Sequence, residues 1–203
     1  MIPVLTRHTE AVPLYAAACA ELRLRGFEGD LTLSDADRTV FSTDNSIYQV
    51  APGGVAFPRT RDDLVRIAKL LDDPRFSEIV IRPRGGATGT NGQSLGHGLV
   101  VDTSRHMNRI LEIDVVNRVV RVEPGVVKDQ LNRELAKHGL FFAPELSTSN
   151  RATIGGMIST DACGQGSCLY GKTRDHVLAL TCVLTDGTVW TAEPLDAEGL
   201  AAA

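Results

Sequence analysis

The segment RPRGGATGTNGQS, residues 82–94, has the residue types of an anion-binding loop. Its four glycines allow positive φ angles and a close approach of the main chain, so that successive N–H groups can point into one concavity. Between them stand threonine, asparagine, glutamine and serine, which add neutral hydrogen-bond donors. A plain turn needs only one or two glycines. The segment therefore predicts a site for a buried pyrophosphate.

A second segment, GSCLYGKT at residues 166–173, matches the P-loop pattern G-x-x-x-x-G-K-[ST] letter for letter. That pattern binds a nucleoside triphosphate only where a buried strand precedes it and a helix follows it. Here TDACGQ precedes it, and the following RDHVLALTCVL has the pattern of a strand. We therefore do not expect an ATP or GTP site. The glycine spacing of residues 82–94 also fails G-x-G-x-x-G, which disfavours a classical NAD fold.

The elements before the first loop form a strand–helix–strand unit. GVAFP (54–58) and EIVIRP (78–83) are predicted strands, and the amphipathic run 61–73 between them is a predicted helix with Thr60 as N-cap and Asp63 three residues on. Such a unit has parallel strands and a right-handed crossover. Ligands of open α/β sheets gather at the carboxyl ends of the strands, where residues 82–94 begin.

The second half of the chain reads as a mostly antiparallel lobe that begins near residue 106. After a strand at 98–102, the pattern predicts a hairpin at 109–125, a helix at 127–138 that stops at Gly139, and two strands within 177–192 joined by an Asp-Gly turn. Residues 143–173 between them are dense in small residues but hold apolar anchors. Long loops of this kind are usually functional or disordered, and the apolar anchors lead us to expect an ordered stretch.

The composition, with 43% hydrophobic and 23% charged residues in 203, is that of a soluble globular protein. A net charge of −4 gives no basic surface for nucleic acid. The longest apolar stretch, residues 11–20, is about half the length of a membrane span, so no transmembrane segment is expected. A secretory signal and a surface helix ending at Gly26 are both compatible with this stretch, and its interrupted, weakly apolar character favours the helix.

The cysteines and histidines indicate neither a disulfide framework nor a metal site. The four cysteines lack C-x-x-C spacing and are expected to be reduced, buried thiols of a cytoplasmic protein, and the five histidines are scattered singly. The cysteines are Cys19, Cys163, Cys168 and Cys182.

Two long motifs in the same order resemble a known family. RPRGGATGTNGQS, followed by ATIGGMISTDACGQGSCLYGKTRDHVLALTCVLTDG, is similar to the FAD-binding domain of the vanillyl-alcohol-oxidase/p-cresol-methylhydroxylase (PCMH-type) superfamily. The resemblance covers residues 40–192. TDNSIYQVAPGGVAFP, SRHMNRILEID and LFFAPELSTSNRATIGG look most like bacterial FAD-linked D-2-hydroxyglutarate and D-lactate dehydrogenases, which carry an iron–sulfur region after the flavin portion.

The resemblance implies an α+β fold in which FAD lies between a small βαβ-containing lobe and a larger, mostly antiparallel lobe. The expected divisions are an N-terminal helical extension at 1–40, a first lobe at 41–105 and a second lobe at 106–203, with substrate and iron–sulfur domains beyond residue 203.

By resemblance, the pyrophosphate lies on the first loop, and the flavin passes along residues 144–147 and over a pair of glycines. The implied FAD-binding residues are Arg84, Gly85, Gly86, Ala87, Thr88, Gly89, Gln93, Ser94, Pro144, Ser147, Thr153, Gly155, Gly156, Ser159, Thr160, Ala162, Gly164, Tyr170, Gly171 and Val183. Some relatives attach flavin through a histidine of the first loop. Because Ala87 and Thr88 stand there, FAD is expected to be non-covalent. Many relatives have Gly at position 87 and Asn at position 161, where this chain has Ala and Asp.

The implied reaction is oxidation of a D-2-hydroxy acid to the 2-oxo acid, with hydride transfer to the flavin and an electron acceptor that the sequence does not identify. This chain contains no convincing catalytic set, and His176 beside Asp175 reads as a surface histidine, so this chain alone is expected to be inactive. Two alternatives remain. One is a flavoenzyme like UDP-N-acetylenolpyruvylglucosamine reductase, and the other is a non-catalytic FAD-binding module.

Overall fold

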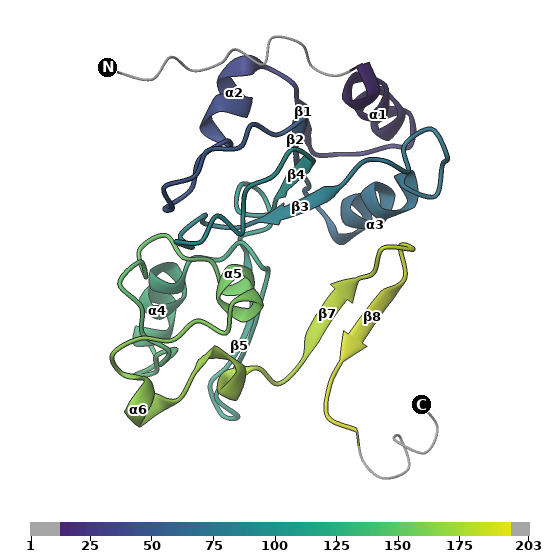
Figure 1. Ribbon diagram of the computed structural model, residues 1–203. Helices are drawn as coiled ribbons and strands as arrows, with labels where there is room; N and C mark the ends of the chain where they lie inside the picture. The colour runs from purple at the N-terminus through teal and green to yellow at the C-terminus, as the bar shows by residue number, and fades with distance from the viewer. Residues whose placement is uncertain (1–12, 196–203) are drawn as a thin grey trace, which may run out of the picture.

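The computed structural model describes residues 13–195. The first lobe of the protein is built on a four-stranded sheet (Figure 1). The strands are β1 (Asp30–Thr32), β2 (Gly54–Phe57), β3 (Ile81–Arg84) and β4 (Leu99–Asp102), in the order β1-β2-β4-β3. β4 is parallel to both β2 and β3, with Val55 opposite Val100 and Pro83 opposite Val101, and β1 pairs antiparallel with β2. The strands of the predicted strand–helix–strand unit are therefore parallel, and β4 lies between them.

Helices cover both faces of this sheet because successive side chains of a strand point to opposite sides. Ala56, Leu99 and Val101 belong to a core cluster with residues of α1 (Pro13–Leu24) and α3 (Arg61–Leu70). Val55, Phe57 and Val100 pack instead with Phe41, which follows α2 (Asp35–Val40). A sheet buried on both faces explains why β2 and β4 are apolar at most positions.

The start of α3 confirms the predicted cap and adds a deeper role for its acidic residue. The Thr60 side chain accepts a hydrogen bond from the Asp63 N–H at 3.2 Å. The Asp63 carboxylate is fully buried and accepts from the N–H groups of Glu28 and Arg59, both at 2.9 Å, and from Arg66 at 3.0 Å. Asp63 thus joins α3 to the segment before β1 and to the end of the β2 strand.

Part of the expected N-terminal extension at 1–40 packs on the first lobe. The helix of the expected extension, α1, ends before Gly26 at φ +80° and buries Ala18 and Leu22 in the core of the first lobe, and β1 joins its sheet. A short helix with one apolar face gains most of its stability from such packing. Residues 1–12, on which part of the secretory-signal interpretation falls, lie outside the described residues.

The second lobe holds an antiparallel hairpin and four short helical segments. β5 (Ile110–Asp114) pairs with β6 (Val119–Val122), and α4 (Lys128–Ala136) ends before Gly139 at φ +68°, as predicted. Within the stretch 143–173, where no regular element was expected, lie α5 (Ile154–Ser159) and α6 (Ser167–Tyr170), followed by the 3₁₀ helix η1 (Thr173–His176). Apolar residues of the stretch 143–173, such as Ile154 and Met157, pack in a core with Val126, Leu131 and Leu135.

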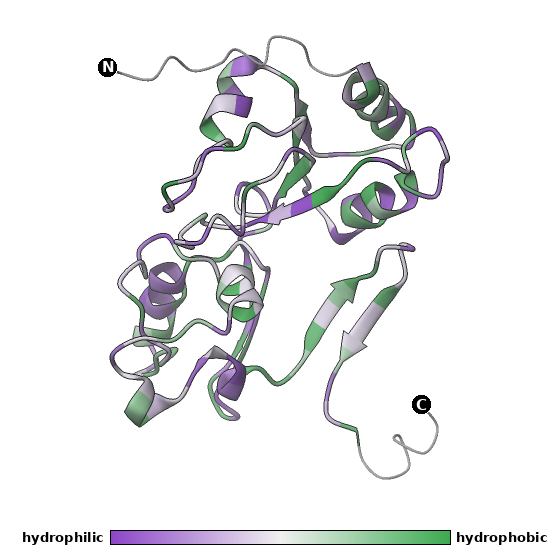
Figure 2. Cartoon of the chain, in the orientation of Figure 1, coloured by the Kyte–Doolittle hydropathy of each residue, from purple (hydrophilic) through white to green (hydrophobic). Residues whose placement is uncertain are grey.

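The final hairpin stands apart from the other strands of the second lobe (Figure 1). β7 (Leu180–Val183) pairs antiparallel with β8 (Val189–Ala192) through the predicted Asp-Gly turn, with Gly187 at φ +82°. This turn lies against Lys69 of α3 in the first lobe. Figure 2 shows hydrophobic residues along both strands, although Leu180, Val189 and Trp190 are exposed.

The described residues include two exposed cysteines and no membrane-spanning helix. No helix among residues 13–195 is long and apolar enough to cross a membrane. The cysteines are free, but the expectation that all are buried is wrong: Cys19 is buried, Cys182 is half-buried, and Cys163 and Cys168 are exposed. The two exposed thiols lie in the segment around α6, which has no buried residue of its own.

Candidate functional site

The glycine loop that follows β3 presents a run of main-chain donors. Residues 85–89 are half-buried, and within the described range no protein group accepts a hydrogen bond from the N–H groups of residues 86–90. The hydroxyl of Thr88 has no protein partner there either. Main-chain N–H groups of folded proteins are nearly always paired when shielded from water. A half-buried run of free donors is the arrangement that binds an anion.

Two glycines of this loop lie directly against the second motif. A Cβ atom on Gly85 would overlap the Thr153 hydroxyl, and one on Gly86 would overlap the Arg151 carbonyl oxygen. The two motifs are therefore in contact, although more than sixty residues of sequence separate them. The prediction explained these glycines by the approach of a pyrophosphate alone. The structure adds a second cause, because only glycine allows the two loops to approach so closely.

The polar side chains that flank the loop bind protein groups. Arg84 donates to the carbonyl oxygens of Phe41 at 3.2 Å and Thr43 at 2.7 Å. Ser94 donates to the Asp44 carboxylate at 2.9 Å, and the exposed Gln93 accepts from the Asn91 N–H at 3.1 Å.

Two charged groups near the loop have shifted pKa values. Burial lowers the pKa of the Arg84 guanidinium, and the charges of Asp102 and Asp44 act against this. For Asp44, burial raises the pKa, but hydrogen bonds from Ser46 and Ser94 and the Arg84 charge outweigh it, so the net pKa is lowered. The lowered pKa of Asp44 favours its charged carboxylate at neutral pH. Arg84 forms no ion pair with a carboxylate of residues 13–195.

The second motif is built on the first turn of α5. The buried Thr153 caps this helix by accepting from the Gly156 N–H at 3.3 Å, and the Gly155 N–H donates to the Pro124 carbonyl at 2.8 Å. The exposed hydroxyls of Ser159 and Thr160 donate to the carbonyls four residues earlier, at 2.9 and 3.0 Å. The N–H groups of Gly155 and Gly156 are thus hydrogen-bonded within the protein. What α5 offers a ligand at these two positions is the surface of the glycines, which carry no side chain.

The other predicted residues lie on the segments around α5 and α6. Pro144 is buried and Ser147 is exposed, and a Cβ atom on Gly164 would overlap the Glu145 carbonyl oxygen, so residues 144–147 run beside residue 164. The Ala162 carbonyl accepts from the Thr173 hydroxyl at 2.7 Å.

Tyr170, Gly171 and Val183 lie further along the chain. The exposed Tyr170 ring packs edge-on against Phe141, with 5.6 Å between ring centroids. Gly171 has φ +77°, and the half-buried Val183 lies on β7. The structure thus brings the first loop to the start of the second motif. Within the described range, no hydrogen bond links Gln93, Tyr170 or Val183 to the place where these two segments meet.

The P-loop look-alike lacks the required surroundings, as predicted. Neither a buried strand precedes α6 nor a full helix follows it, since Thr160–Gly166 lie in turns and loops and η1 spans four residues. The Lys172 ammonium lies 3.9 Å from Asp161. Asp161 also accepts from the Arg174 N–H at 3.1 Å.

His176 and Asp175 do not form an acid–base pair. His176 is exposed and its Nε2 bonds the Tyr170 carbonyl at 2.7 Å, while the Asp175 carboxylate accepts from the Lys172 N–H at 2.7 Å. No group of three or more His, Cys, Asp or Glu side chains suited to a metal occurs among residues 13–195.

A cavity of about 890 Å³ lies elsewhere, between the β5–β6 hairpin, α4, α5 and β7. Its wall includes Arg109, Val120, Leu135 and Leu180. Of the predicted FAD-binding residues only Gly155 and Val183 line it, and no residue of the glycine loop does. The cavity is therefore distinct from the glycine loop.

The segment after α2 contacts the glycine loop but is absent from the predicted FAD-binding residues. The Asn45 N–H donates to the Ala87 carbonyl at 3.2 Å, Asp44 binds Ser94, and Tyr48 lies against Gly92. The available signal was the run Thr-Asp-Asn-Ser at 43–46, whose side chains favour turns that bring a loop back onto its neighbours.

Comparison with known proteins identifies a family and related enzymes. Residues 52–193 match the family described as the FAD binding domain. Relatives include D-2-hydroxyglutarate dehydrogenases of Pseudomonas putida, 62% identical over 86% of this chain and 17% of that protein, and of Escherichia coli, 54% identical over 98% and 19%. The chain thus spans about a fifth of the length of these curated relatives.

Solved structures show the same fold at low identity. Alkyldihydroxyacetonephosphate synthase superposes with a TM-score of 0.75 at 21% identity, covering 89% of this chain and 38% of that one. 6-hydroxy-D-nicotine oxidase of Arthrobacter nicotinovorans superposes with a TM-score of 0.71 at 23% identity, covering 83% of this chain and 36% of that one. These neighbours confirm the predicted α+β, PCMH-type architecture. With the family match over residues 52–193 and the high identity to the bacterial relatives, they establish that this chain belongs to the family of FAD-binding domains.

Proposed function

We propose that this chain is the FAD-binding portion of a dehydrogenase that oxidises a D-2-hydroxy acid, D-2-hydroxyglutarate or D-lactate, to the 2-oxo acid. The observation that carries the proposal is the run of free N–H groups at residues 86–90 beside the neutral hydroxyl of Thr88. This donor set fits a diphosphate, because it matches phosphate oxygens without needing a cation for each charge. The substrate class follows from the names of the relatives.

In this proposal FAD lies between the lobes at 41–105 and 106–203, with the diphosphate on Gly85–Gly89 and the flavin toward residues 144–147 and the glycines of α5. FAD would accept a hydride equivalent from C2 of the hydroxy acid. The residues of this chain bind and orient the cofactor, and the groups that bind substrate and take up its proton belong to the parts of the relatives outside the matched region. We expect FAD to be non-covalent, since no histidine stands in the first loop, and we expect a cytoplasmic protein, since the described cysteines are free.

The test compares one residue of each glycine-rich segment by titrating the purified chain with FAD and following flavin fluorescence. Gly86→Val puts a β-branched side chain between the loop and the Arg151 carbonyl, so FAD binding should fall below the measurable range. Lys172→Ala removes the cation that a P-loop would need, and its FAD affinity should stay within about tenfold of the parent, or roughly 1.4 kcal/mol.

Circular dichroism checks that both variants are folded. Loss of a measurable ATP affinity in Lys172→Ala, together with intact FAD binding in Gly86→Val, would overturn the proposed function.

A further inference from the structure

Arg84 stands at the end of β3, directly before the glycine loop, where a cation would be expected to bind phosphate. Its guanidinium instead reaches the carbonyl oxygens of Phe41 and Thr43, at 3.2 and 2.7 Å, and lies over the Phe41 ring at 4.9 Å from the centroid. Phe41 itself packs edge-on against Phe57, with centroids 5.4 Å apart, in the core beneath the sheet. The planar fork of arginine suits two carbonyl groups presented side by side.

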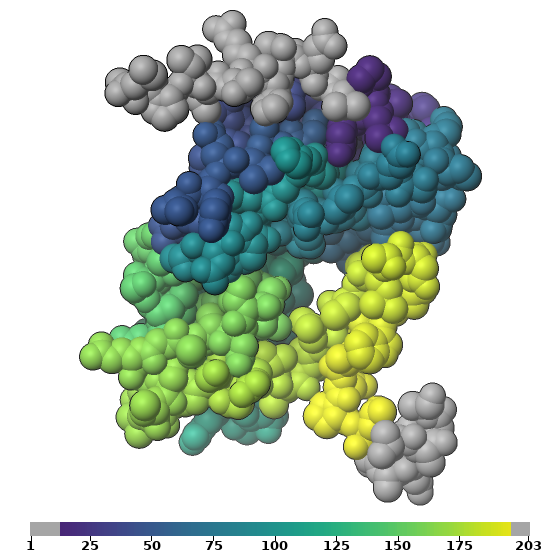
Figure 3. Space-filling model, viewed as in Figure 1, coloured from purple at the N-terminus to yellow at the C-terminus, as the bar shows by residue number. Residues whose placement is uncertain are grey.

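The segment that Arg84 holds, residues 41–48, lies on the glycine loop. Three contacts join them: the Asn45 N–H to the Ala87 carbonyl at 3.2 Å, Ser94 to Asp44 at 2.9 Å, and the Tyr48 ring against Gly92. In Figure 3 the blue surface of this segment adjoins the teal-blue surface of the loop after β3. Because the Ala87 carbonyl is taken by Asn45, the peptide between residues 87 and 88 is held with its N–H on the opposite side, free for a ligand.

We propose that Arg84 is a positioning residue: it fixes the segment 41–48 over the glycine loop and thereby orients the N–H groups of residues 86–90, and it is not a phosphate ligand. This inference rests on the proposed function for its ligand, FAD, but its structural part concerns the chain alone. A phosphate ligand acts through its charge, whereas a positioning residue acts through the geometry of its fork. Replacements with and without charge therefore separate the two roles.

The experiment uses the full 203-residue chain with Arg84→Lys and Arg84→Gln. Hydrogen exchange is measured without FAD by mass spectrometry over residues 41–50, and it should become at least tenfold faster in both variants. The reason is that the hydrogen bonds of the Asn45 and Val50 N–H groups should open more often. FAD affinity should fall about tenfold in both and by similar factors, with little dependence on salt. Arg23→Gln is the control, since it removes an exposed arginine charge from α1 of the same lobe and should change neither readout.

Two results of this experiment would contradict a positioning role for Arg84. Unchanged exchange over residues 41–50 in Arg84→Gln would overturn the inference. So would an FAD affinity that Lys preserves and Gln loses, with a loss that grows as salt is lowered, because that pattern identifies a phosphate ligand. If the parent chain binds no FAD, the proposed function fails, while the exchange comparison still decides whether Arg84 holds the segment.

Discussion

Ala87 and Asp161, where the family resemblance implies Gly and Asn in many relatives, both adopt a left-handed backbone. Ala87 has φ +51° and Asp161 has φ +46°, a region that Gly and Asn tolerate best. The Asp161 carboxylate compensates in part by accepting from the Arg174 N–H and pairing with the Arg174 side chain at 3.4 Å. Ala87 has no side-chain partner that could do the same. Backbone strain is thus stored in the glycine loop itself.

The strain at Ala87 predicts a stabilising substitution. Ala87→Gly should raise the free energy of unfolding by about 1 kcal/mol, since the left-handed conformation costs an L-residue roughly 1–2 kcal/mol and glycine recovers most of it. Urea unfolding followed by circular dichroism measures the change.

Ala136→Gly is the matched control for that change. Ala136 is exposed at the end of α4, so the same chemical replacement should there lower the free energy of unfolding by about 1 kcal/mol. Equal losses in both variants would contradict the left-handed conformation of residue 87.

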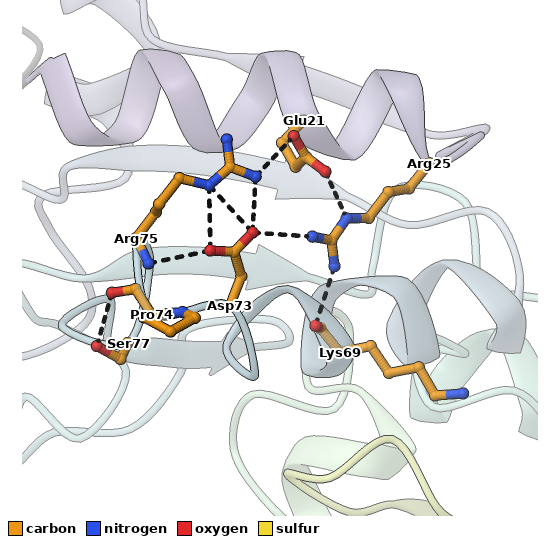
Figure 4. A network of polar contacts seen from close by, with 7 residues as sticks. All are labelled: Glu21, Arg25, Lys69, Asp73, Pro74, Arg75 and Ser77. Atoms are coloured by element: carbon orange, nitrogen blue, oxygen red, sulfur yellow. Dashed lines mark hydrogen bonds and ion pairs between the residues drawn. The ribbon is translucent and has the colours of Figure 1, made fainter.

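At the scale of elements, four charged side chains tie α1 to the loop after α3 (Figure 4). Arg75 binds Asp73 at 2.6 Å and Glu21 at 3.2 Å, and Arg25 binds Glu21 at 2.9 Å and the Lys69 carbonyl at 3.0 Å. The hydrogen bonds from Arg75 lower the pKa of Asp73 from 3.8 to about 2. The network supplements the apolar contacts through which α1 already packs on α3.

This network predicts a pH-dependent contribution to stability. A carboxylate whose pKa is lowered on folding stabilises the folded state above its unfolded pKa of 3.8, and that contribution is lost as the pH falls toward about 2. Asp73→Asn should therefore lower the melting temperature at neutral pH, and its difference from the parent should shrink through this window. Calorimetry across the pH range measures it.

Asp72→Asn provides the comparison, because Asp72 is exposed beside Asp73 and takes no part in the network. It should leave the melting temperature nearly unchanged at every pH. A deficit of Asp73→Asn that stayed constant below pH 3.8 would rule out the ionised carboxylate as its source.

At the scale of the whole molecule, the β7–β8 hairpin is weakly joined to the rest. Its turn lies against Lys69, its approach runs through η1, and Figure 3 shows an opening between it and the remainder of the chain. Leu180 and Val189 are 37% and 40% exposed, and Trp190 is 54% exposed. Such exposure of large apolar residues on a two-stranded hairpin implies low local stability.

The single tryptophan of the chain reports on this hairpin. Because Trp190 is exposed, its emission should lie close to that of free N-acetyltryptophanamide, and acrylamide should quench it readily. Steady-state fluorescence of the purified chain measures both. Blue-shifted emission that acrylamide quenches poorly would mean that the hairpin is covered in solution, and repetition at falling protein concentration would tell whether a second copy covers it.

The local elements could be predicted from the sequence because their signals lie within a few residues of one another. The Thr60 cap, the stop at Gly139, the Asp-Gly turn before β8 and the parallel strands around α3 were all predicted correctly, since each follows from side-chain periodicity or from local hydrogen bonds. The two glycine-rich motifs likewise identified the family without coordinates.

Only the tertiary structure decided which distant groups meet. The contact of Gly86 with Arg151, the engagement of Arg84 by Phe41 and Thr43, and the packing of α1 on α3 join residues far apart in the chain. No local pattern encodes such contacts, because they depend on the order of strands in the sheet and on how closely two loops can approach. For the same reason the sequence identified the glycines of the loop but could not tell that two of them make room for another loop, and that an arginine beside them binds protein carbonyls.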